Sequence, residues 1–209
     1  GAVQIVSAGA PHQVLHRRLQ DITMDSPILR AVLRRWDEIA LPDCWLVAGA
    51  LAQSVWNASF GLPASHGISD IDLVYFDGED LTEESEAQQA RRLAALFRDL
   101  PVRLDVKNEA RVHLWYAGKF ERSIAAYSST FDAMTTFPTT ATAVGVRPIG
   151  VDLQVAAPYG LTDLMRCVVR PNKKQITRDI YEAKIRRWRS LWPGLSIHDW
   201  DDPDACIPH

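Results

Sequence analysis

Residues 69–76 read Ser-Asp-Ile-Asp-Leu-Val-Tyr-Phe and place two carboxylates, Asp70 and Asp72, at the start of an apolar run. Alternate residues of a strand point to the same face, so both side chains project together from a largely buried strand. Two adjacent carboxylates repel each other unless a cation lies between them. Mg²⁺ favours oxygen sites of this kind. Asp is also common where strands begin, so the meaning of the pair depends on its surroundings.

The composition is that of an ordinary globular protein. The 209 residues, 47% hydrophobic and 23% charged, suffice for one domain or two small ones. A net charge of -3 argues against a general nucleic-acid binder, which is usually basic. Cys44, Cys167 and Cys206 lack any CxxC spacing, which favours a reduced, cytoplasmic protein over a disulfide framework or zinc site. No apolar run reaches membrane-spanning length, so no membrane partner is expected.

The predicted elements alternate along the chain. Ser26 and Pro27 predict the N-cap and first position of a helix that extends toward Leu41, and Thr82 predicts another N-cap. Apolar runs and alternation predict strands at 44–48, 69–76, 102–107, 141–147 and 151–156. Helices are predicted at 51–60, 128–134, 161–169 and 176–192. Residues 112–116 are predicted to form a further strand or an irregular extension.

The order of these elements resembles that of the nucleotidyltransferase superfamily typified by DNA polymerase beta. The residues that match its motifs are Gly49-Ala50 after the first strand, Asp70 and Asp72 on the next, and Asp105 on a later strand. Residues 45–57, 105–116 and 160–172 also resemble a bacterial family of small nucleotidyltransferase-like proteins. The resemblance implies an α+β fold: a small mixed twisted sheet flanked by helices, with a helical C-terminal portion.

The resemblance covers residues 41–192, and we expect a single nucleotidyltransferase-like domain over residues 1–209. Within it, N-terminal helices are expected over 1–40 and the sheet core with the metal site over 41–157. C-terminal helices are expected over 158–193, followed by a tail over 194–209.

The resemblance also implies a reaction. An NMP group would move from an NTP to the hydroxyl of an acceptor (a small molecule, a protein or an RNA end) with release of pyrophosphate. Asp70, Asp72 and Asp105 are the implied catalytic residues and ligands of Mg²⁺ (or Mn²⁺). Asp105 would hold the ion that activates the acceptor hydroxyl, or take its proton directly. Asp99 and Asp152 are rival third carboxylates.

Six residues are candidates for nucleotide binding, namely Gly49, Ala50, Ser69, Lys107, Arg111 and Arg170. Gly49 lets the backbone approach a triphosphate, and the helix that follows presents free N–H groups to it. Ala50 departs from the Gly or Ser of the superfamily, and its Cβ would be strained if the backbone there needed a positive φ. This departure favours an alternative, a catalytically inactive nucleotide-binding or partner-binding relative.

Other features admit two interpretations each. The long loop that contains His66 is a candidate cover for the site. His113 is either a base or a hydrogen-bonding residue at the edge of the core. The basic C-terminal region, which includes Lys184, is either a solvated helix face or a surface that steers phosphorylated substrates. Nucleic-acid binding by these helices is a weaker third hypothesis.

Overall fold

The structure, a computed structural model, describes residues 10–203. Predictions on residues 1–9, on Cys206 and on the end of the tail at 204–209 lie outside this range. The helices are α1 Ala10–Asp25, α2 Pro27–Leu33, α3 Trp36–Ile39, α4 Gly49–Ser59, α5 Glu83–Leu96, α6 Val112–Phe120, α7 Thr130–Met134, α8 Thr162–Met165 and α9 Arg178–Leu191. The strands are β1 Trp45–Val47, β2 Asp70–Tyr75, β3 Arg103–Asn108, β4 Gly145–Ile149, β5 Asp152–Ala156, β6 Val168–Val169 and β7 Ser196–Ile197.

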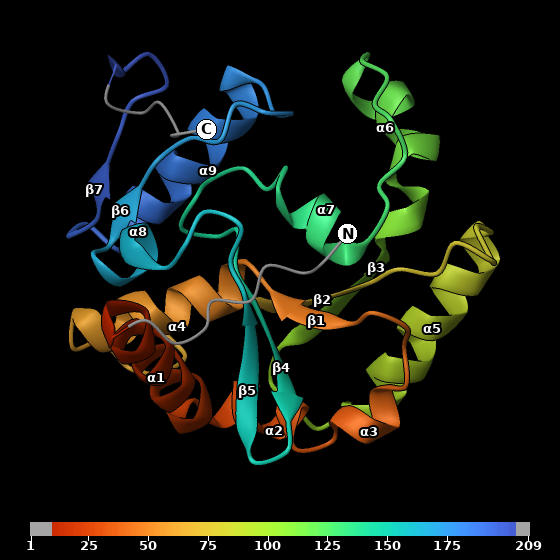
Figure 1. The fold of residues 1–209 in the computed structure, drawn as a ribbon, viewed down its shortest axis with the longest axis horizontal. Helices are drawn as coiled ribbons and strands as arrows, with labels where there is room; N and C mark the ends of the chain where they lie inside the picture. Colours follow the sequence, from red (N-terminus) through yellow and green to blue (C-terminus); the bar gives the residue numbers. More distant parts are fainter. Residues whose placement is uncertain (1–9, 204–209) are drawn as a thin grey trace.

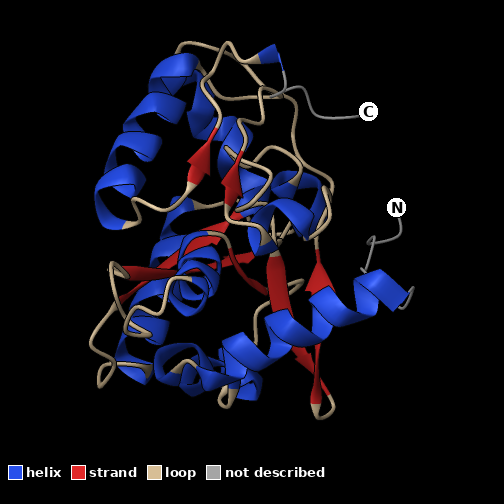
Figure 2. Cartoon of the chain, turned by 90° about the vertical axis from the view of Figure 1, so that its left-hand side faces the viewer, coloured by secondary structure: helices blue, strands red, loops and turns tan. Residues whose placement is uncertain are grey.

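The main sheet has the strand order β3-β2-β1-β4-β5. β2 and β3 are parallel, whereas β1 is antiparallel to both β2 and β4. In Figure 1, α1, α2 and α3 lie below β1 and β2, α5 lies to their right, and α6, α7, α8 and α9 lie above them. Figure 2 shows the short β6–β7 pair apart from the main sheet. This arrangement confirms the predicted mixed sheet flanked by helices with a helical C-terminal portion.

The two faces of the sheet differ. Leu46, Ile71 and Leu73 belong to the main hydrophobic core. On the opposite face, Trp45 and Val47 belong to a smaller cluster with Val74, Met134 of α7 and Ala156. Asp72 pairs with Val47, and Asp70 and Asp72 alternate with the core residues of β2. The two carboxylates therefore lie on the face away from the main core.

Local chemistry explains where several helices begin. The Ser26 hydroxyl accepts a hydrogen bond from the Leu29 N–H, and Pro27 holds the first helical position of α2. The Thr82 hydroxyl likewise accepts from the Ser85 N–H at the start of α5. Both predicted N-caps are confirmed.

Four predicted elements differ from the structure. The strand expected at 141–147 begins later, because β4 spans Gly145–Ile149. The helix expected up to Leu41 is two helices, because α2 ends at Leu33 and α3 ends before the left-handed Ala40. Residues 112–116 are helical, so the predicted strand was wrong: the Asn108 side chain accepts from the Ala110 N–H and turns the chain into a 3-10 turn (η1, Glu109–Arg111) that leads into α6. The helix expected at 161–169 is shorter, since α8 ends before Cys167 with its φ of 57°.

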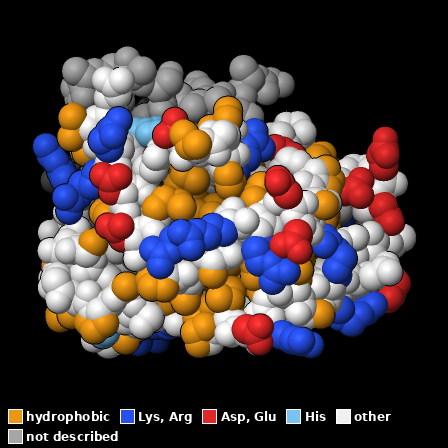
Figure 3. Space-filling model, turned by 90° about the horizontal axis from the view of Figure 1, so that it is seen from below, with side chains coloured by type: hydrophobic (Ala, Val, Ile, Leu, Met, Phe, Trp, Pro, Cys, Tyr) orange, Lys and Arg blue, Asp and Glu red, His pale blue; other side chains and the backbone are white. Residues whose placement is uncertain are grey.

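The face seen from below is partly apolar (Figure 3). Val151, at the tip of the β4–β5 hairpin, is 99% exposed, and Ile149 is also exposed. Across the part of the chain from 10 to 203, no helix is both long enough and apolar enough to cross a bilayer.

Candidate metal centre

Three carboxylates meet on the face of the sheet away from the main core. The parallel register of β2 and β3 places Asp105 directly beside Asp72. Carboxylate oxygens of Asp70, Asp72 and Asp105 all lie within 4.8 Å of one another. Neither rival joins this group among the described residues: Asp152 lies on β5 at the opposite edge of the sheet, and Asp99 follows α5. Strand pairing therefore selects Asp105 as the third carboxylate of the cluster.

The electrostatics of the cluster fit a divalent cation. Burial, the Asp105 carboxylate and the Asp70 carboxylate, in that order, raise the pKa of Asp72 to about 7. Among the described residues, basic side chains form ion pairs with the two outer carboxylates: Lys107 Nζ lies 3.4 Å from Asp105 Oδ2, and Arg103 Nη2 lies 3.9 Å from Asp70 Oδ2. The Ser69 hydroxyl donates to Asp70 Oδ1 at 3.2 Å. Three carboxylates are a donor set that Mg²⁺ and Mn²⁺ prefer, and a bound cation would relieve the repulsion.

The N-terminus of α4 lies beside this cluster. A Cβ added to Gly49 would stand 3.7 Å from Asp72 Oδ2 and 3.6 Å from Gln53 Nε2. The N–H groups in the first turn of α4, including that of Ala50, have no intrahelical partner, and no side chain within residues 10–203 caps the helix. Free N–H groups and the helix dipole favour an anion here. The site thus offers ligands for a cation and donors for an anion side by side.

Backbone strain falls on Ala48 and not on Ala50. Ala48, the N-cap of α4, has φ 60° and ψ -121°, whereas Ala50 lies within the helix and is not among the described residues with positive φ. Strain of this kind costs about 1–3 kcal/mol and concentrates at functional sites. The Cβ of Ala50 therefore causes no backbone strain. Ala50 still lacks the hydroxyl that a Ser at this position would offer to a phosphate. The strain at Ala48 had no signal in the sequence.

Two of the candidate nucleotide-binding residues form ion pairs elsewhere. Arg111 is buried, donates to the Leu81 carbonyl and pairs with Glu86 of α5 at 2.8 Å. Arg170 pairs with Asp163 of α8 at 3.0 Å. Neither is brought to the three carboxylates by an interaction seen here, and their contact with a nucleotide stays a prediction from the sequence.

The Arg111–Glu86 pair gives a stability prediction. Arg111→Met leaves the partly buried Glu86 carboxylate without its cation, and we expect the free energy of unfolding to fall by about 3 kcal/mol. Urea unfolding checks this. Arg91→Met, which breaks the exposed Arg91–Glu84 pair, is the control and should cost less than about 1 kcal/mol. Equal losses in both variants would contradict the structural role of Arg111.

The loop with His66 is bound to α9. His66 Nε2 lies 2.8 Å from the Leu191 carbonyl oxygen, and Arg187 donates to the Gly67 carbonyl at 3.1 Å. Gly67 has φ 70°, and a Cβ there would stand 2.6 Å from the Trp192 ring. Trp192 Nε1 in turn donates to Asn57 of α4 at 2.7 Å. These contacts fix α9 relative to α4 and β2, so the loop holds α9 in its position.

Lys184 of α9 lies within electrostatic range of the carboxylate cluster. Burial lowers its pKa, and the carboxylates of Asp72 and Asp70 act in the opposite direction, which places Lys184 within electrostatic reach of both. No ion pair of Lys184 is seen within residues 10–203. The sequence alone does not distinguish Lys184 from the other basic residues of the C-terminal region. The packing of α9 against the rest of the fold distinguishes it. His113 Nδ1 is buried and has no hydrogen-bond partner among the described residues.

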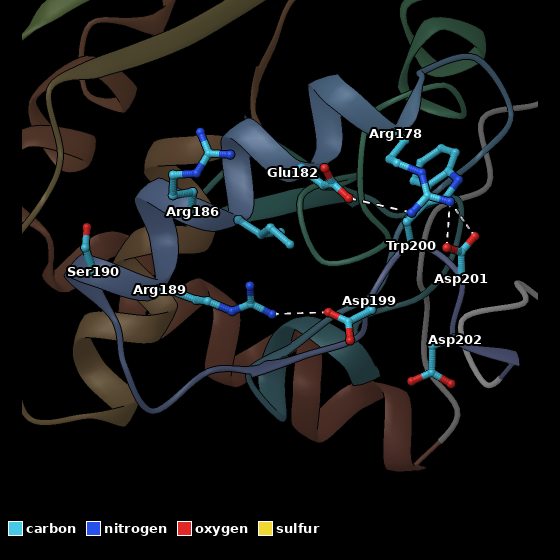
Figure 4. A pocket seen from close by; sticks show the side chains of 10 residues that line it. Arg178, Glu182, Arg186, Arg189, Ser190, Asp199, Trp200, Asp201 and Asp202 are labelled. Atoms are coloured by element: carbon cyan, nitrogen blue, oxygen red, sulfur yellow. Dashed lines mark hydrogen bonds and ion pairs between the residues drawn. The ribbon is translucent and has the colours of Figure 1, made fainter.

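The opposite side of α9 has different surroundings (Figure 4). A surface pocket there is lined by Arg178, Arg186 and Arg189 together with acidic residues, and none of the three clustered carboxylates lines it. Arg178 pairs with Asp201 and Glu182, and Arg189 pairs with Asp199. Much of the basic charge on this side is therefore neutralised within the chain.

Known proteins share this sequence pattern and this architecture. A family described as nucleotidyltransferase matches residues 34–197. A structure described as "The NMR structure of the protein reveals a CCA-adding enzyme head domain" is 26% identical, with a TM-score of 0.72 over 88% of this chain and 95% of that one. This match confirms the α+β fold. No curated protein matches the chain.

Two further solved structures are more distant. One is a tRNA-processing enzyme in an apo form, 14% identical, with a TM-score of 0.45 over 93% of this chain and 46% of that one. The other is a CCA-adding enzyme in complex with ATP, 16% identical, with a TM-score of 0.46 over 87% of this chain and 41% of that one. This chain spans less than half the length of either.

Proposed function

This chain belongs to the nucleotidyltransferase family, and from that premise we propose that it moves an NMP group from an NTP to an acceptor hydroxyl, with release of pyrophosphate, in a reaction that needs a divalent metal. The observation that carries the proposal is the meeting of Asp70, Asp72 and Asp105 within 4.8 Å beside the uncapped N-terminus of α4. Phosphoryl transfer needs mainly positioning and electrostatic stabilisation, and this arrangement supplies both.

Each residue has a proposed part. Asp70, Asp72 and Asp105 would hold Mg²⁺ (or Mn²⁺), which when bound neutralises charge on the triphosphate and lowers the pKa of the acceptor hydroxyl. The N–H groups at the start of α4 would hold phosphate oxygens, and Gly49 leaves them room to approach. Asp105, which lies on the edge strand β3 of the main sheet, would accept the proton of the acceptor hydroxyl. Ser69 would keep Asp70 oriented through its hydrogen bond.

We also propose that Lys184 contacts the triphosphate. The carboxylates of Asp72 and Asp70 act electrostatically on its ammonium, and the contacts of His66 and Gly67 with the end of α9 hold that helix in place. A phosphate bound between the metal centre and Lys184 would have its remaining negative charge neutralised by the Lys184 ammonium. This role supports treating the sheet and the C-terminal helices as parts of one functional domain.

The Lys184 proposal predicts a loss of nucleotide affinity. Lys184→Ala should weaken binding of a fluorescent ATP analogue by about tenfold, the loss expected for one hydrogen bond to a charged group. Fluorescence titration with Ca²⁺ in place of Mg²⁺ measures binding without turnover. Arg186→Ala on the same helix is the matched control, because Arg186 lines the pocket on the opposite side. Equal losses in both variants would mean that only general positive charge attracts the nucleotide.

The activity test works with an unidentified acceptor. The protein is incubated with Mg²⁺ and each NTP labelled on the α-phosphate, together with pools of short RNAs, small hydroxyl compounds and proteins. Pyrophosphate release together with transfer of label to one pool supports the proposal. Absence of both with every NTP and pool, under conditions where the nucleotide binds, would favour the inactive relative.

A further inference from the structure

Three charged residues alternate along the end of β3. Asp105, Lys107 and Glu109 occupy every second position, and the backbone stays extended through Asn108, with φ -86° and ψ 106°. Alternate residues of an extended chain share one face, with a spacing of about 6.6 Å. Lys107 therefore stands between two carboxylates, one of which belongs to the candidate metal centre.

Lys107 occupies a position that competes with a cation. Its Nζ lies 3.4 Å from Asp105 Oδ2, one of the atoms that a metal ion would need. The ammonium of Lys107 neutralises part of the negative charge of the three carboxylates. When a divalent cation binds, repulsion would drive the ammonium away from Asp105. The Lys107 side chain is 51% exposed and has a flexible stem, so it is free to move.

Glu109 is the available second partner. The residue is only 6% exposed, and its carboxylate makes no hydrogen bond or ion pair that the structure of residues 10–203 shows. Its other charged neighbours, Glu86, Asp72 and Asp105, are all acidic, and Glu86 is already paired with Arg111. Burial and this acidic surrounding raise the pKa of Glu109 to about 7, against the opposing effect of Lys107. The Glu109 oxygens are not among the fully buried side-chain atoms that lack a hydrogen-bond partner, so the carboxylate stays accessible to a cation that approaches it.

We propose that Lys107 exchanges partners when a divalent cation binds, leaving Asp105 for Glu109, and that Glu109 is thereby a positioning residue for metal loading. The inference rests on the metal centre of the proposed function. With Glu109 present, the displaced ammonium keeps a buried anionic partner. Without Glu109, Lys107 stays at Asp105 and competes with the incoming ion. The contact of Lys107 with phosphate, expected from the sequence, is the competing role.

The test is the binding of Mn²⁺ alone to the full chain, followed by calorimetry. Lys107→Met should tighten binding several-fold, because the competing ammonium is gone. Glu109→Gln should weaken it by about tenfold, as mutations of residues that orient metal ligands do. In the Lys107→Met background, Glu109→Gln should change the affinity less than twofold. Glu84→Gln, on the exposed face of α5, is the control for loss of a distant negative charge and should leave the affinity unchanged.

Other outcomes overturn the exchange. An equal loss from Glu109→Gln in both backgrounds would show a long-range charge effect only. An unchanged affinity in Lys107→Met would show that Lys107 does not compete with the ion. Failure of the wild-type protein to bind Mn²⁺ would overturn the metal centre of the proposed function together with the exchange. A crystal structure of the Mn²⁺-loaded wild type decides independently of the variants: Lys107 Nζ beside Glu109 supports the exchange, and Nζ still on Asp105 or in solvent overturns it.

Discussion

Asp72→Asn is expected to reduce kcat/KM for nucleotidyl transfer by about 10³-fold, since the loss of several kcal/mol of transition-state stabilisation changes the rate by tenfold for each 1.4 kcal/mol. Asp72 is the member of the cluster closest to α4, and it lies beside Asp105 in the strand register. Asn has nearly the same shape but no charge, so the variant keeps the fold and loses the ligand. Pyrophosphate release under saturating Mg²⁺ measures the effect.

The rival carboxylates supply the controls. Asp152→Asn and Asp99→Asn remove one negative charge each without touching the cluster, and both should keep more than half of the activity. The Asp152 carboxylate accepts a hydrogen bond only from the exposed side chain of Gln20 among the described residues. If Asp72→Asn retained a tenth of the wild-type rate, or if Asp152→Asn were as damaging, the assignment of the cluster as the catalytic centre would be wrong.

The second large effect is on stability. Without metal, the melting temperature should fall as the pH rises from about 4 to about 7. The folded pKa of Asp72 is about 7, above the ordinary 3.8, so in this window the folded state holds a proton that the unfolded state has released. Stability then decreases with rising pH, and above about 7 the penalty is constant. Glu109, whose pKa is also raised to about 7, acts in the same direction.

The size of this effect is limited by the coupling between the carboxylates. A shift of this size corresponds to at most about 4 kcal/mol, and we expect roughly half of it to be expressed. For a chain of this length, 2 kcal/mol corresponds to about 4–8 °C in melting temperature. Thermal unfolding in EDTA and in 10 mM Mg²⁺ (roughly, to saturate a weak site) at pH 5 and pH 8 tests this.

Mg²⁺ should restore most of the loss at pH 8 and little at pH 5, because only the ionised carboxylates bind it. Asp72→Asn should flatten the pH dependence and raise the melting temperature of the metal-free protein at pH 8. A metal-free melting temperature that rises from pH 5 to pH 8 would contradict the raised pKa of Asp72. The variant that is expected to be least active is thus expected to be the more stable one without metal.

Much of the local structure could be predicted because it depends on neighbours in the chain. The Ser26 and Thr82 hydroxyls cap their own helices, and the period of two along β2 places Asp70 and Asp72 on one face whatever the rest of the fold does. Residues 112–116 were mispredicted because apolar composition does not distinguish a buried helix from a strand over so few residues. A single side chain, Asn108, decided that segment by turning the backbone.

The pair of carboxylates, the glycine at the start of α4 and the order of the elements follow from the sequence alone, because each depends on residues a few positions apart. The rest of the site depends on tertiary packing. The parallel register of β2 with β3 places Asp105, and neither Asp99 nor Asp152, beside Asp72, and Arg111 forms a partly buried ion pair with Glu86. The packing of α9 brought Lys184 within electrostatic range of Asp72. Distances between segments far apart in the chain follow from packing and strand pairing, and no local pattern encodes them.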